Sequence, residues 1–582
     1  MKNINIKYFV IISSLALAAC DEIYLEKLPL DEISSESYWK TTDDLKLFVN
    51  QFYPTAFEVS GSDRYEFIFA DDLESDDMIH VQEAPRLQGS RVVPATGGWN
   101  YASIRSVNYF LANYQKCESD FEEYKKYVGE ALFFRAFFYF DLLKAYGDVP
   151  YIGKPLKTDS EELYMARTPR NQVADSIVAD LDKAIEYLPS GKLEGGTRLS
   201  KEIAQMYKSR VCLYEGTWEK YHAGSVFGVE NSNPEKYLQM AVQAAEGVMQ
   251  SGIYSIYSSG NPEWDYFFFG QLDYSNNSEV LLWKKYDLSL EVGHARQFQI
   301  ATGTSGGMGL TKVFAESYLC IDGNPIYQSD GSPNPLYQGD SDLITFSTNR
   351  DPRFKQTIFT PGFPLQVSGS DTTFFVRPSV DRPAHTVNPT GYQINKTLSF
   401  DPIHHQSLET RGVGYTGWII LRYAEVLLNY VEAKAELGTV TQNDIDNTIK
   451  LLRDRVAMPN LVISAIKTDP NWLFPDLSPV INEIRRERRI ELVAEGFRWD
   501  DLARWAAADE AIKGQRLLGA KFNAIDYPDL SASDFSLTNG YFDPLKNRLP
   551  DGFGFDLGRD YLNPISTEEL TLNKNLVQNP GW

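Results

Sequence analysis

The segment from Glu487 to Leu502 carries the densest set of ionisable side chains that could do chemistry. A glycoside hydrolase needs two carboxyl groups across a cleft, one of them with a raised pKa. On a helix, a spacing of three or four residues would instead bring each carboxylate beside an arginine, which lowers the carboxyl pKa. The pairs are Arg488 with Glu491, Glu495 with Arg498, and Asp500 with Arg504. The segment therefore favours a structural ion-pair network over catalysis.

Metal-binding patterns are weak. Asp71-Asp72 and Asp76-Asp77 could bind calcium through carboxylate oxygens, but we expect solvated turns at both positions. The adjacent His404-His405 pair points in two directions on a helix or a strand, so it is a poor chelator of one metal ion. No HExxH, GxSxG, P-loop or nucleotide-binding glycine motif occurs in a suitable context. We therefore expect no cofactor and no metal, with structural calcium as an alternative that no motif supports.

Aromatic side chains interleaved with amides point to sugar recognition. One such loop holds Arg86, Arg91, Trp99, Asn100 and Tyr101, and another, 261–277, holds Trp264, Tyr266 and Tyr274. An aromatic ring can stack on a sugar face, while an amide or a guanidinium binds hydroxyl groups. Any single tryptophan is more often core than ligand site, and this holds also for Trp418 and Trp472. The candidate ligand-binding residues are Trp99, Asn100, Arg86, Trp264 and Tyr274.

The amino terminus predicts a lipoprotein signal. Lys2 and Lys7 precede the apolar run 8–17, and small residues then lead to Cys20. This run is too short to span a bilayer, and it is typical of a secretory signal. We expect cleavage before Cys20 and acylation of its thiol and new amine, which gives stable membrane anchoring. An ordinary signal peptide with a chance cysteine is the alternative.

The charge balance restricts the ligands. The chain carries 79 Asp and Glu against 56 Lys and Arg, a formal net charge of −23, which repels nucleic acid and polyanions. A neutral or cationic ligand is favoured, and the 13% of aromatic residues suits a neutral sugar. Besides Cys20 there are three cysteines, Cys117, Cys212 and Cys320, which allow at most one disulfide and no zinc site.

Apolar spacing predicts a mainly α-helical fold. Periods near 3.6 residues indicate helices at 124–146, 173–188, 200–216 and 234–251, with Gly147 and Pro150 ending the first. Paired helices of this length resemble tetratricopeptide repeats. Further helices are expected at 418–437, 443–456 and 480–507. The region between them is rich in Gly, Pro, Ser and Asn, which predicts long loops with short strands near 280–283, 372–376 and 391–396.

The chain resembles the SusD/RagB family of surface lipoproteins of Bacteroidota. The resemblance runs in order along nearly the whole sequence and rests on the signal ending at Cys20 and on these segments: Leu25–Pro29, Arg135–Pro150, Tyr423–Leu428, Glu487–Leu502, Tyr561–Ile565 and Gln578–Trp582. It implies about four tetratricopeptide-like helix pairs packed against an irregular, loop-rich half. It also implies surface export, which the acidic Asp21-Glu22 fits, and capture of glycan without cleavage beside a SusC-like TonB-dependent barrel of the outer membrane.

These observations predict a lipid-anchored, non-catalytic protein on the outer surface that binds neutral oligo- or polysaccharide. The alternatives are a surface-anchored glycoside hydrolase, and a peptide-uptake or scaffolding helical-repeat protein. Family ligand sites lie in variable loops, so no binding residue follows from the shared motifs. The expected organisation is a signal peptide at 1–19, a lipidated tether at 20–37, a helical region at 38–260, and a loop-rich and C-terminal helical region at 261–582, the last two forming one fold.

Overall fold

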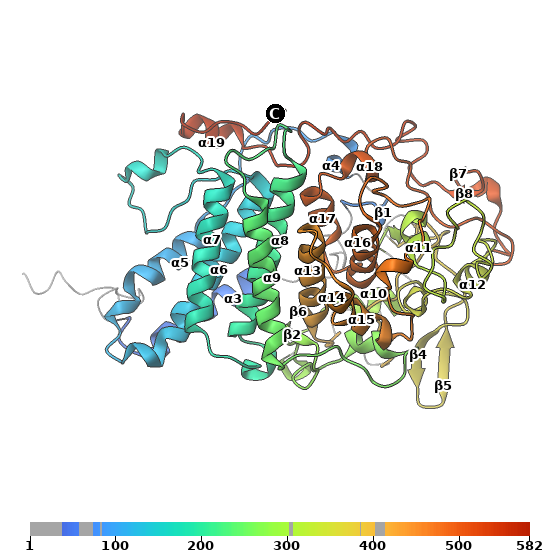
Figure 1. Ribbon diagram of the computed structural model, residues 1–582, viewed down its shortest axis with the longest axis horizontal. Coiled ribbons are helices and arrows are strands. Elements are labelled where there is room, and N and C mark those ends of the chain that lie inside the picture. Colours follow the sequence, from blue (N-terminus) through green and yellow to red (C-terminus); the bar gives the residue numbers. More distant parts are fainter. Residues whose placement is uncertain are drawn as a thin grey trace, which may run out of the picture.

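The structure is a computed structural model that describes residues 38–57, 74–81, 84–290, 292–301, 306–383, 386–401 and 414–582. The predicted signal peptide, Cys20, the tether, Asp71-Asp72 and His404-His405 lie outside these residues, as does the side chain of Tyr266. Figure 1 shows a block of long helices on the left and a part with shorter elements and long loops on the right. This is the mainly α-helical architecture that the sequence predicts.

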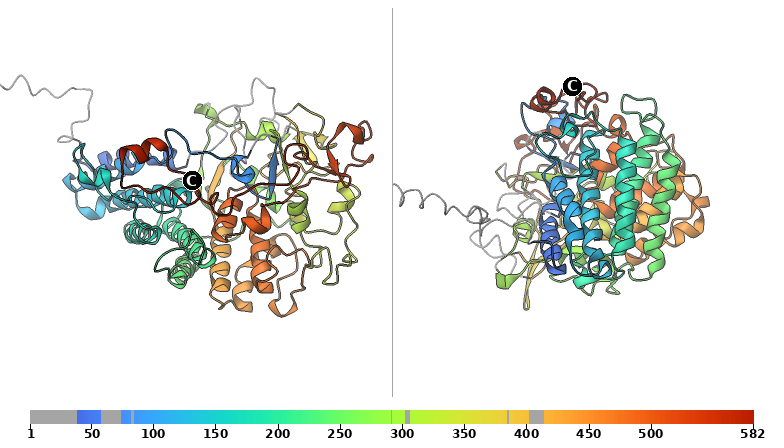
Figure 2. Two further views of the ribbon diagram at one scale, coloured as in Figure 1. Left: turned by 90° about the horizontal axis from the view of Figure 1, so that it is seen from above. Right: turned by 90° about the vertical axis from the view of Figure 1, so that its left-hand side faces the viewer.

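Successive long helices pack side by side in the first half of the chain (Figure 2). The block consists of α6 (Phe121–Tyr146), α7 (Arg170–Tyr187), α8 (Lys201–Tyr221) and α9 (Pro234–Ser251). All four begin and end close to the predicted positions, and their packing in sequence order is the predicted helical-repeat arrangement. The sequence analysis did not predict the shorter helices before them, which are α2 (Thr42–Asn50), α3 (Phe52–Ala56), α4 (Pro85–Gln88) and α5 (Ala102–Asn113).

Helix α6 is buried on most of its circumference. Phe134 packs edge-on against Tyr53 of α3 with ring centroids 4.9 Å apart, and Phe133 contacts Tyr207 of α8 at 5.1 Å. A helix that is apolar all round belongs in the interior, as its sequence indicates. Gly147 ends the helix with a φ of 71°, a conformation that side chains with a Cβ rarely adopt.

Three predicted helices are interrupted in the structure, one by strand β6 and two by turns. Segment 418–437 begins as β6 (Trp418–Arg422), which pairs antiparallel with β2 (Val280–Lys284), and continues as helix α13 (Tyr423–Glu436). Segment 480–507 divides into α16 (Pro479–Leu492) and α17 (Arg498–Arg504), and α18 (Ala508–Ala511) follows it. Segment 443–456 divides into α14 (Gln442–Asp446) and α15 (Ile449–Arg455). Helical spacing of apolar residues does not reveal a strand whose partner is distant in sequence.

Short antiparallel pairs cross the loop-rich part. Besides β2 and β6, they are β1 (Met78–His80) with β3 (Met308–Leu310), β4 (Pro364–Ser368) with β5 (Asp371–Phe374), and β7 (Leu537–Thr538) with β8 (Tyr541–Phe542). The predicted strand at 391–396 is absent, and within it Ile394 alone forms a bridge, with Ile358. The remaining short α-helices are α10 (Arg296–Ala301), α11 (Lys312–Ser317), α12 (Leu343–Ser347) and α19 (Thr567–Leu572).

One hydrophobic core joins the two parts of the fold. It includes Trp39 near the start of the described chain, Leu427 of α13 and Ile565 near the C-terminus, all fully buried. Cys117, Cys212 and Cys320 are buried free thiols, so these three form no disulfide. Within the described ranges, no helix has both the length and the apolar character needed to cross a membrane.

Candidate functional site

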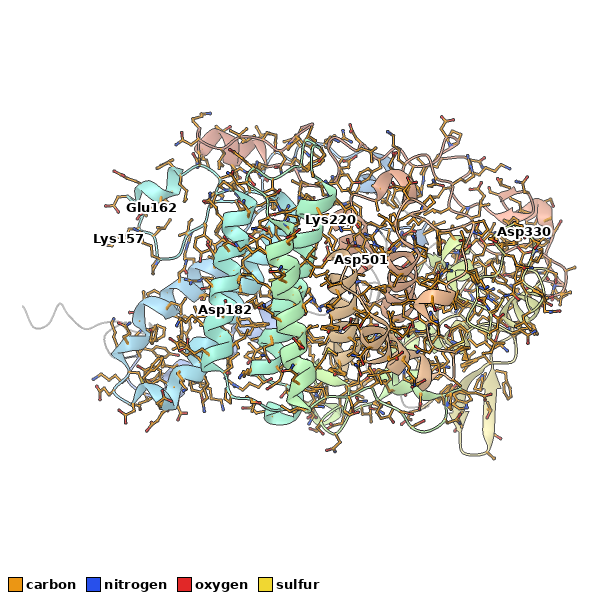
Figure 3. All side chains as sticks on the ribbon, in the orientation of Figure 1. Lys157, Glu162, Asp182, Lys220, Asp330 and Asp501 are labelled. Atoms are coloured by element: carbon orange, nitrogen blue, oxygen red, sulfur yellow. The ribbon has the colours of Figure 1, made fainter. Side chains whose placement is uncertain are left out.

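A cavity of about 600 Å³ lies beside helix α5 and brings together segments that are distant in sequence. Its walls come from the stretch 99–108, the loop 150–163, and Glu569, Asn573 and Leu576 near the C-terminus. Lys157 and Glu162, labelled in Figure 3, mark the loop wall. The volume is typical of small-ligand sites. Of the residues selected from the sequence, Trp99 and Asn100 line this cavity, whereas Arg86, Trp264 and Tyr274 do not.

Glycine at position 98 allows the backbone to approach Tyr146 and so sets the place of Trp99. Gly98 has a φ of 109°, and a Cβ added there would lie 2.9 Å from the Tyr146 hydroxyl oxygen. The Trp99 ring then meets Tyr146 and Tyr101 edge-on, with centroids 5.7 and 6.1 Å away. Trp99 is therefore held by two tyrosine rings while it stays partly exposed at the cavity wall.

Asn100 places a polar group beside this ring. Its Oδ1 atom accepts a hydrogen bond from the backbone N–H of Ala102 at 2.8 Å, which forms a local turn just before helix α5. Among the described residues, nothing accepts a hydrogen bond from its amide nitrogen, and the residue is exposed. The amide N–H groups are thus available to a ligand hydroxyl beside the Trp99 ring.

The wall around Pro150 and Ile152 is held in place by hydrogen bonds within the protein. The Asn108 side-chain amide of α5 donates to the Ile152 carbonyl at 2.8 Å. The Tyr139 hydroxyl of α6 donates to the same carbonyl at 2.9 Å and accepts from the Ile152 N–H at 2.7 Å. Tyr101 adds a hydrogen bond to the Pro150 carbonyl at 2.8 Å. A wall that is already ordered costs little conformational entropy on binding.

Helix α19 closes the cavity from the C-terminal end of the chain. Ser566 caps this helix, with its Oγ accepting from the Glu569 N–H at 3.4 Å. Asn573 donates to the Met165 carbonyl at 2.9 Å, which ties the helix to the loop wall. The sequence analysis missed this helix, although Ser566 followed by Glu569 is a pattern typical of a helix start.

The charged groups at the cavity nearly balance. Lys154 Nζ lies 2.5 Å from Glu162 Oε1, and this hydrogen bond lowers the pKa of the Glu162 carboxyl. Arg105, Lys157 and Glu569 complete the charged lining. Mixed signs at the wall suit an uncharged ligand with many hydroxyl groups better than a strongly ionic one.

Trp264 belongs to a separate aromatic cluster. Its ring lies 5.5, 6.0 and 5.7 Å from the rings of Phe267, Phe363 and Phe400. The residue is 37% exposed, so part of the indole faces solvent. Phe363 directly precedes β4, and Figure 1 shows the β4–β5 hairpin far from α19. The two tryptophans therefore define two different surfaces.

Tyr274 and Arg86 make contacts within the protein, and neither lines the Trp99 cavity. Tyr274 is 0% exposed, and its hydroxyl donates to the Phe269 carbonyl at 2.7 Å. The guanidinium of Arg86 binds Glu74, the Asp560 carbonyl and the Asn563 side chain at 2.6 to 2.9 Å. Each guanidinium nitrogen of Arg86 thus already donates to a protein acceptor, which favours a structural role for this side chain.

The 487–502 segment forms the expected structural network, but through other partners. Because α16 ends at Leu492, Arg488 pairs with Asp501 at 2.8 Å, and Glu491 accepts from Arg455 and Arg422 at 2.5 and 2.7 Å. Burial would raise the pKa of Glu491, yet these guanidinium groups hold it below its ordinary value. Asp501, labelled at the centre of Figure 3, also has a lowered pKa, since Arg488 and Arg504 outweigh its burial. Such carboxylates do not act as general acids.

The expectation of a solvated turn at Asp76-Asp77 is wrong. Both residues are 1% exposed. Asp76 Oδ1 accepts from Arg498 Nε at 2.6 Å, and Asp77 Oδ1 accepts from Arg489 Nε at the same distance. Buried carboxylates satisfied by guanidinium groups have a structural role. Within the described residues, no group of three or more His, Cys, Asp or Glu is placed to hold a metal ion.

Family models match both parts of the chain. The model described as "SusD family" matches residues 273–582, and one described as "Starch-binding associating with outer membrane" matches residues 24–213. The first covers more than half of the sequence, so the chain belongs to the SusD family. The resemblance inferred from its motifs is thereby confirmed.

Individual relatives agree with this assignment. SusD-like protein P2 of Formosa agariphila is 24% identical over 596 residues, which cover 100% of both chains. A SusD-like carbohydrate-binding protein of Bacteroides fragilis has a similar structure, with a TM-score of 0.66 and 21% identity over 93% of this chain and 100% of that one. A laminarin-binding SusD-like protein superposes with a TM-score of 0.55 and 20% identity, again over 93% and 100%. These structures show that the fold is shared.

Proposed function

We propose that this chain captures neutral oligo- or polysaccharide at the cell surface and passes it, uncleaved, to a SusC-like TonB-dependent barrel. The observation that carries the proposal is the preformed cavity in which Trp99 and Asn100 stand side by side. Relatives described as carbohydrate-binding and laminarin-binding support a glycan as the ligand. The family description that names starch binding and the outer membrane supports the location.

Binding would use both the apolar face and the hydroxyl groups of a sugar ring. The Trp99 ring would exclude water from the apolar face of a sugar ring, while the Asn100 amide would bind a hydroxyl oxygen. A protein that must release its cargo to a transporter is expected to bind weakly, with a Kd on the order of micromolar to millimolar. Because the ligand is uncharged, the Kd should change little with salt concentration.

The attachment proposed here is the lipid on Cys20. The apolar run 8–17 is removed with the signal, so acylation of Cys20 would carry the whole membrane attachment. The acidic Asp21-Glu22 pair after it supports display on the outer face, and the family resemblance supports the barrel as the partner.

Calorimetry with a panel of short neutral oligosaccharides tests the ligand class and the site together. We expect binding by the unchanged chain and at least a tenfold weaker affinity for Trp99→Ala. Trp264→Ala is the matched control, because its ring lies in a separate cluster and a short ligand at the Trp99 cavity does not reach it. Equal affinity of Trp99→Ala and the unchanged chain would place the site elsewhere.

Two further measurements separate the proposal from its alternatives. A reducing-end assay on the same glycans should show no hydrolysis, and turnover that one Asp or Glu substitution abolishes would favour a glycoside hydrolase. Short neutral peptides should not compete with glycan, and binding of peptides alone would favour a peptide-uptake role.

A further inference from the structure

Arg296, the first residue of α10, is a buried cation that forms no salt bridge with any of the described residues. It is 5% exposed, and its Nε atom has no hydrogen-bond acceptor. Across the part of the chain that the structure describes, no carboxylate lies within 4.0 Å of its guanidinium and no oxygen accepts a hydrogen bond from it. The equally buried Arg353 and Arg504 each bind two or more carboxylates. An unpaired buried charge is unfavourable, so an anion is expected beside Arg296.

Trp418 fixes the plane of this guanidinium. The central carbon of the Arg296 guanidinium lies 3.7 Å from the centroid of the Trp418 ring, at the start of β6. Stacking occupies one face of the guanidinium and leaves its N–H edge for a ligand. Burial lowers the pKa of Arg296 to about 10, so the side chain remains a cation at neutral pH.

A small pocket opens beside the stacked pair. Its volume is about 100 Å³, and Phe269, Thr397 and the turn 494–497 also line it. Since one water takes about 30 Å³ in the liquid, the pocket has room for a carboxylate group and a few attached atoms. None of its lining residues also lines the Trp99 cavity.

The other charges at the pocket wall are already compensated. Glu425 binds Arg210 at 2.6 Å. Glu495 binds Lys396 at 2.6 Å and Arg422 at 2.7 Å. Among the described residues, Arg296 is therefore the cation of this pocket that forms no salt bridge, although Glu495 attracts it from a longer distance.

The turn that forms one wall is held in an unusual conformation. Ala494 has a φ of 61°, and Gly496 has a φ of 82°. A non-glycine residue in the left-handed region is strained, and such residues cluster where a fold shapes a ligand site. Glu495, between these two residues, pairs with Lys396 and Arg422, and the turn lines the pocket that Arg296 also lines.

We propose that this pocket binds a compact carboxylate, whose two oxygens accept hydrogen bonds from the guanidinium edge of Arg296 while Trp418 stacks on the guanidinium face. A planar carboxylate matches that edge with two parallel hydrogen bonds. The carboxylate belongs either to a free small organic acid or to a sugar acid. The inference does not rest on the glycan site, because the two pockets are separate.

Thermal unfolding of the purified full chain tests the proposal. We compare sodium acetate, sodium galacturonate and sodium sulfate with sodium chloride at equal ionic strength. Acetate at ten times its Kd should raise the folding equilibrium constant roughly elevenfold over chloride. Arg296→Gln should lose this effect, whereas Arg377→Gln should keep it, because Arg377 is a surface residue paired with Asp381. Stabilisation by galacturonate as well identifies a sugar acid as the ligand, and stabilisation by acetate alone identifies a free acid.

Equal unfolding in acetate and chloride, or stabilisation by sulfate alone, would overturn the assignment. Because Arg296→Gln could fail to fold, a second readout uses the unchanged chain. Crystals grown with bromoacetate should show anomalous bromine density in the pocket lined by Arg296 and Trp418. Bromine density at other positions only would refute the proposal.

Discussion

The Nε atom of Arg498 donates a hydrogen bond to Oδ1 of Asp76 across 2.6 Å, although 422 residues separate the two in sequence. A second hydrogen bond of 2.8 Å joins Arg498 Nη2 to Asp76 Oδ2, which makes the pair bidentate. Arg489 of α16 binds the same carboxylate at 2.9 Å. These contacts join the segment before β1 to helices α16 and α17. The fold of the loop-rich part therefore depends on both ends of this link.

We predict that Asp76→Asn lowers the free energy of unfolding by about 3–5 kcal/mol, because it removes the buried carboxylate that pairs with both Arg498 and Arg489. Denaturant unfolding at neutral pH measures the loss. Asp182→Asn is the control, since Asp182 is exposed on α7 and pairs with Lys208 at the surface (Figure 3). Asp182→Asn should lower the free energy of unfolding by less than about 1 kcal/mol. Similar losses in both variants would refute a special role for Asp76.

The buried His222 predicts a pH dependence of stability. Its ring stacks on Trp218 at 4.0 Å, and burial lowers its pKa to about 4 from the ordinary 6.5. The folded state thus disfavours the protonated ring. The contribution of neutral His222 to the free energy of unfolding is therefore complete above pH 6.5. It is lost as the pH falls toward 4, because the unfolded chain binds the proton first.

Comparison with His222→Gln isolates this contribution, because other titrating groups are common to both proteins. The unfolding free energy of the unchanged chain should fall relative to the variant by at most about 1.4 kcal/mol per pH unit between pH 6.5 and 4. Denaturant unfolding at several pH values measures it. If the curves of unfolding free energy against pH for the two proteins were parallel over this interval, the His222 ring would be accessible to water.

Gly98 offers a test of how the Trp99 ring is placed. Gly98→Ala would bring a Cβ within 2.9 Å of the Tyr146 hydroxyl and move the Trp99 loop, so affinity for a neutral oligosaccharide should fall. Gly97→Ala is the matched control, because Gly97 also has a positive φ, 80°, but a Cβ there has no atom within 4 Å. Calorimetry should give the weaker binding for Gly98→Ala. Equal losses of affinity in the two variants would show that backbone strain, and not the contact with Tyr146, weakens binding.

The proposed lipid anchor on Cys20 gives a further prediction. Cys20→Ala should release the protein from the membrane fraction or leave it with an uncleaved signal, because no thiol remains at the new amino terminus. Fractionation with a high-salt wash, followed by mass spectrometry of the amino terminus, measures both outcomes. A correctly cleaved variant that still sediments with washed outer membrane would contradict the assignment.

Local spacing predicted the long helices well, because each buries a continuous face that a 3.6-residue period reveals. The same period suggested a helix over Trp418–Arg422, where pairing with distant β2 imposes a strand instead. It also suggested one helix through Ala494, whose left-handed backbone begins a turn. Both failures reflect tertiary contacts that override local preference.

The candidate site was predictable in part. Trp99 and Asn100 could be chosen because an aromatic ring beside an amide suits a sugar. Tyr274 looked equivalent in sequence, yet its hydroxyl is satisfied inside the core. The contribution of α19 could not follow from sequence alone, since it depends on Asn573 reaching the loop near Met165, 408 residues away.

Trp264 gives the last prediction. Its partly exposed ring, supported by Phe267, Phe363 and Phe400, forms a stacking surface away from the Trp99 cavity. A single exposed ring binds a short oligosaccharide too weakly for calorimetry to detect beside the Trp99 cavity, whereas a polysaccharide offers sugar units to both surfaces. Linked binding events raise the apparent affinity without new contacts. We therefore expect Trp264→Ala to weaken retention in polysaccharide affinity gels while calorimetry with a short oligosaccharide stays unchanged. Trp472→Phe is the control, because the Trp472 indole N–H donates a hydrogen bond to Glu483 within the protein. This variant should be retained normally. Unchanged retention of Trp264→Ala would restrict glycan binding to the Trp99 cavity.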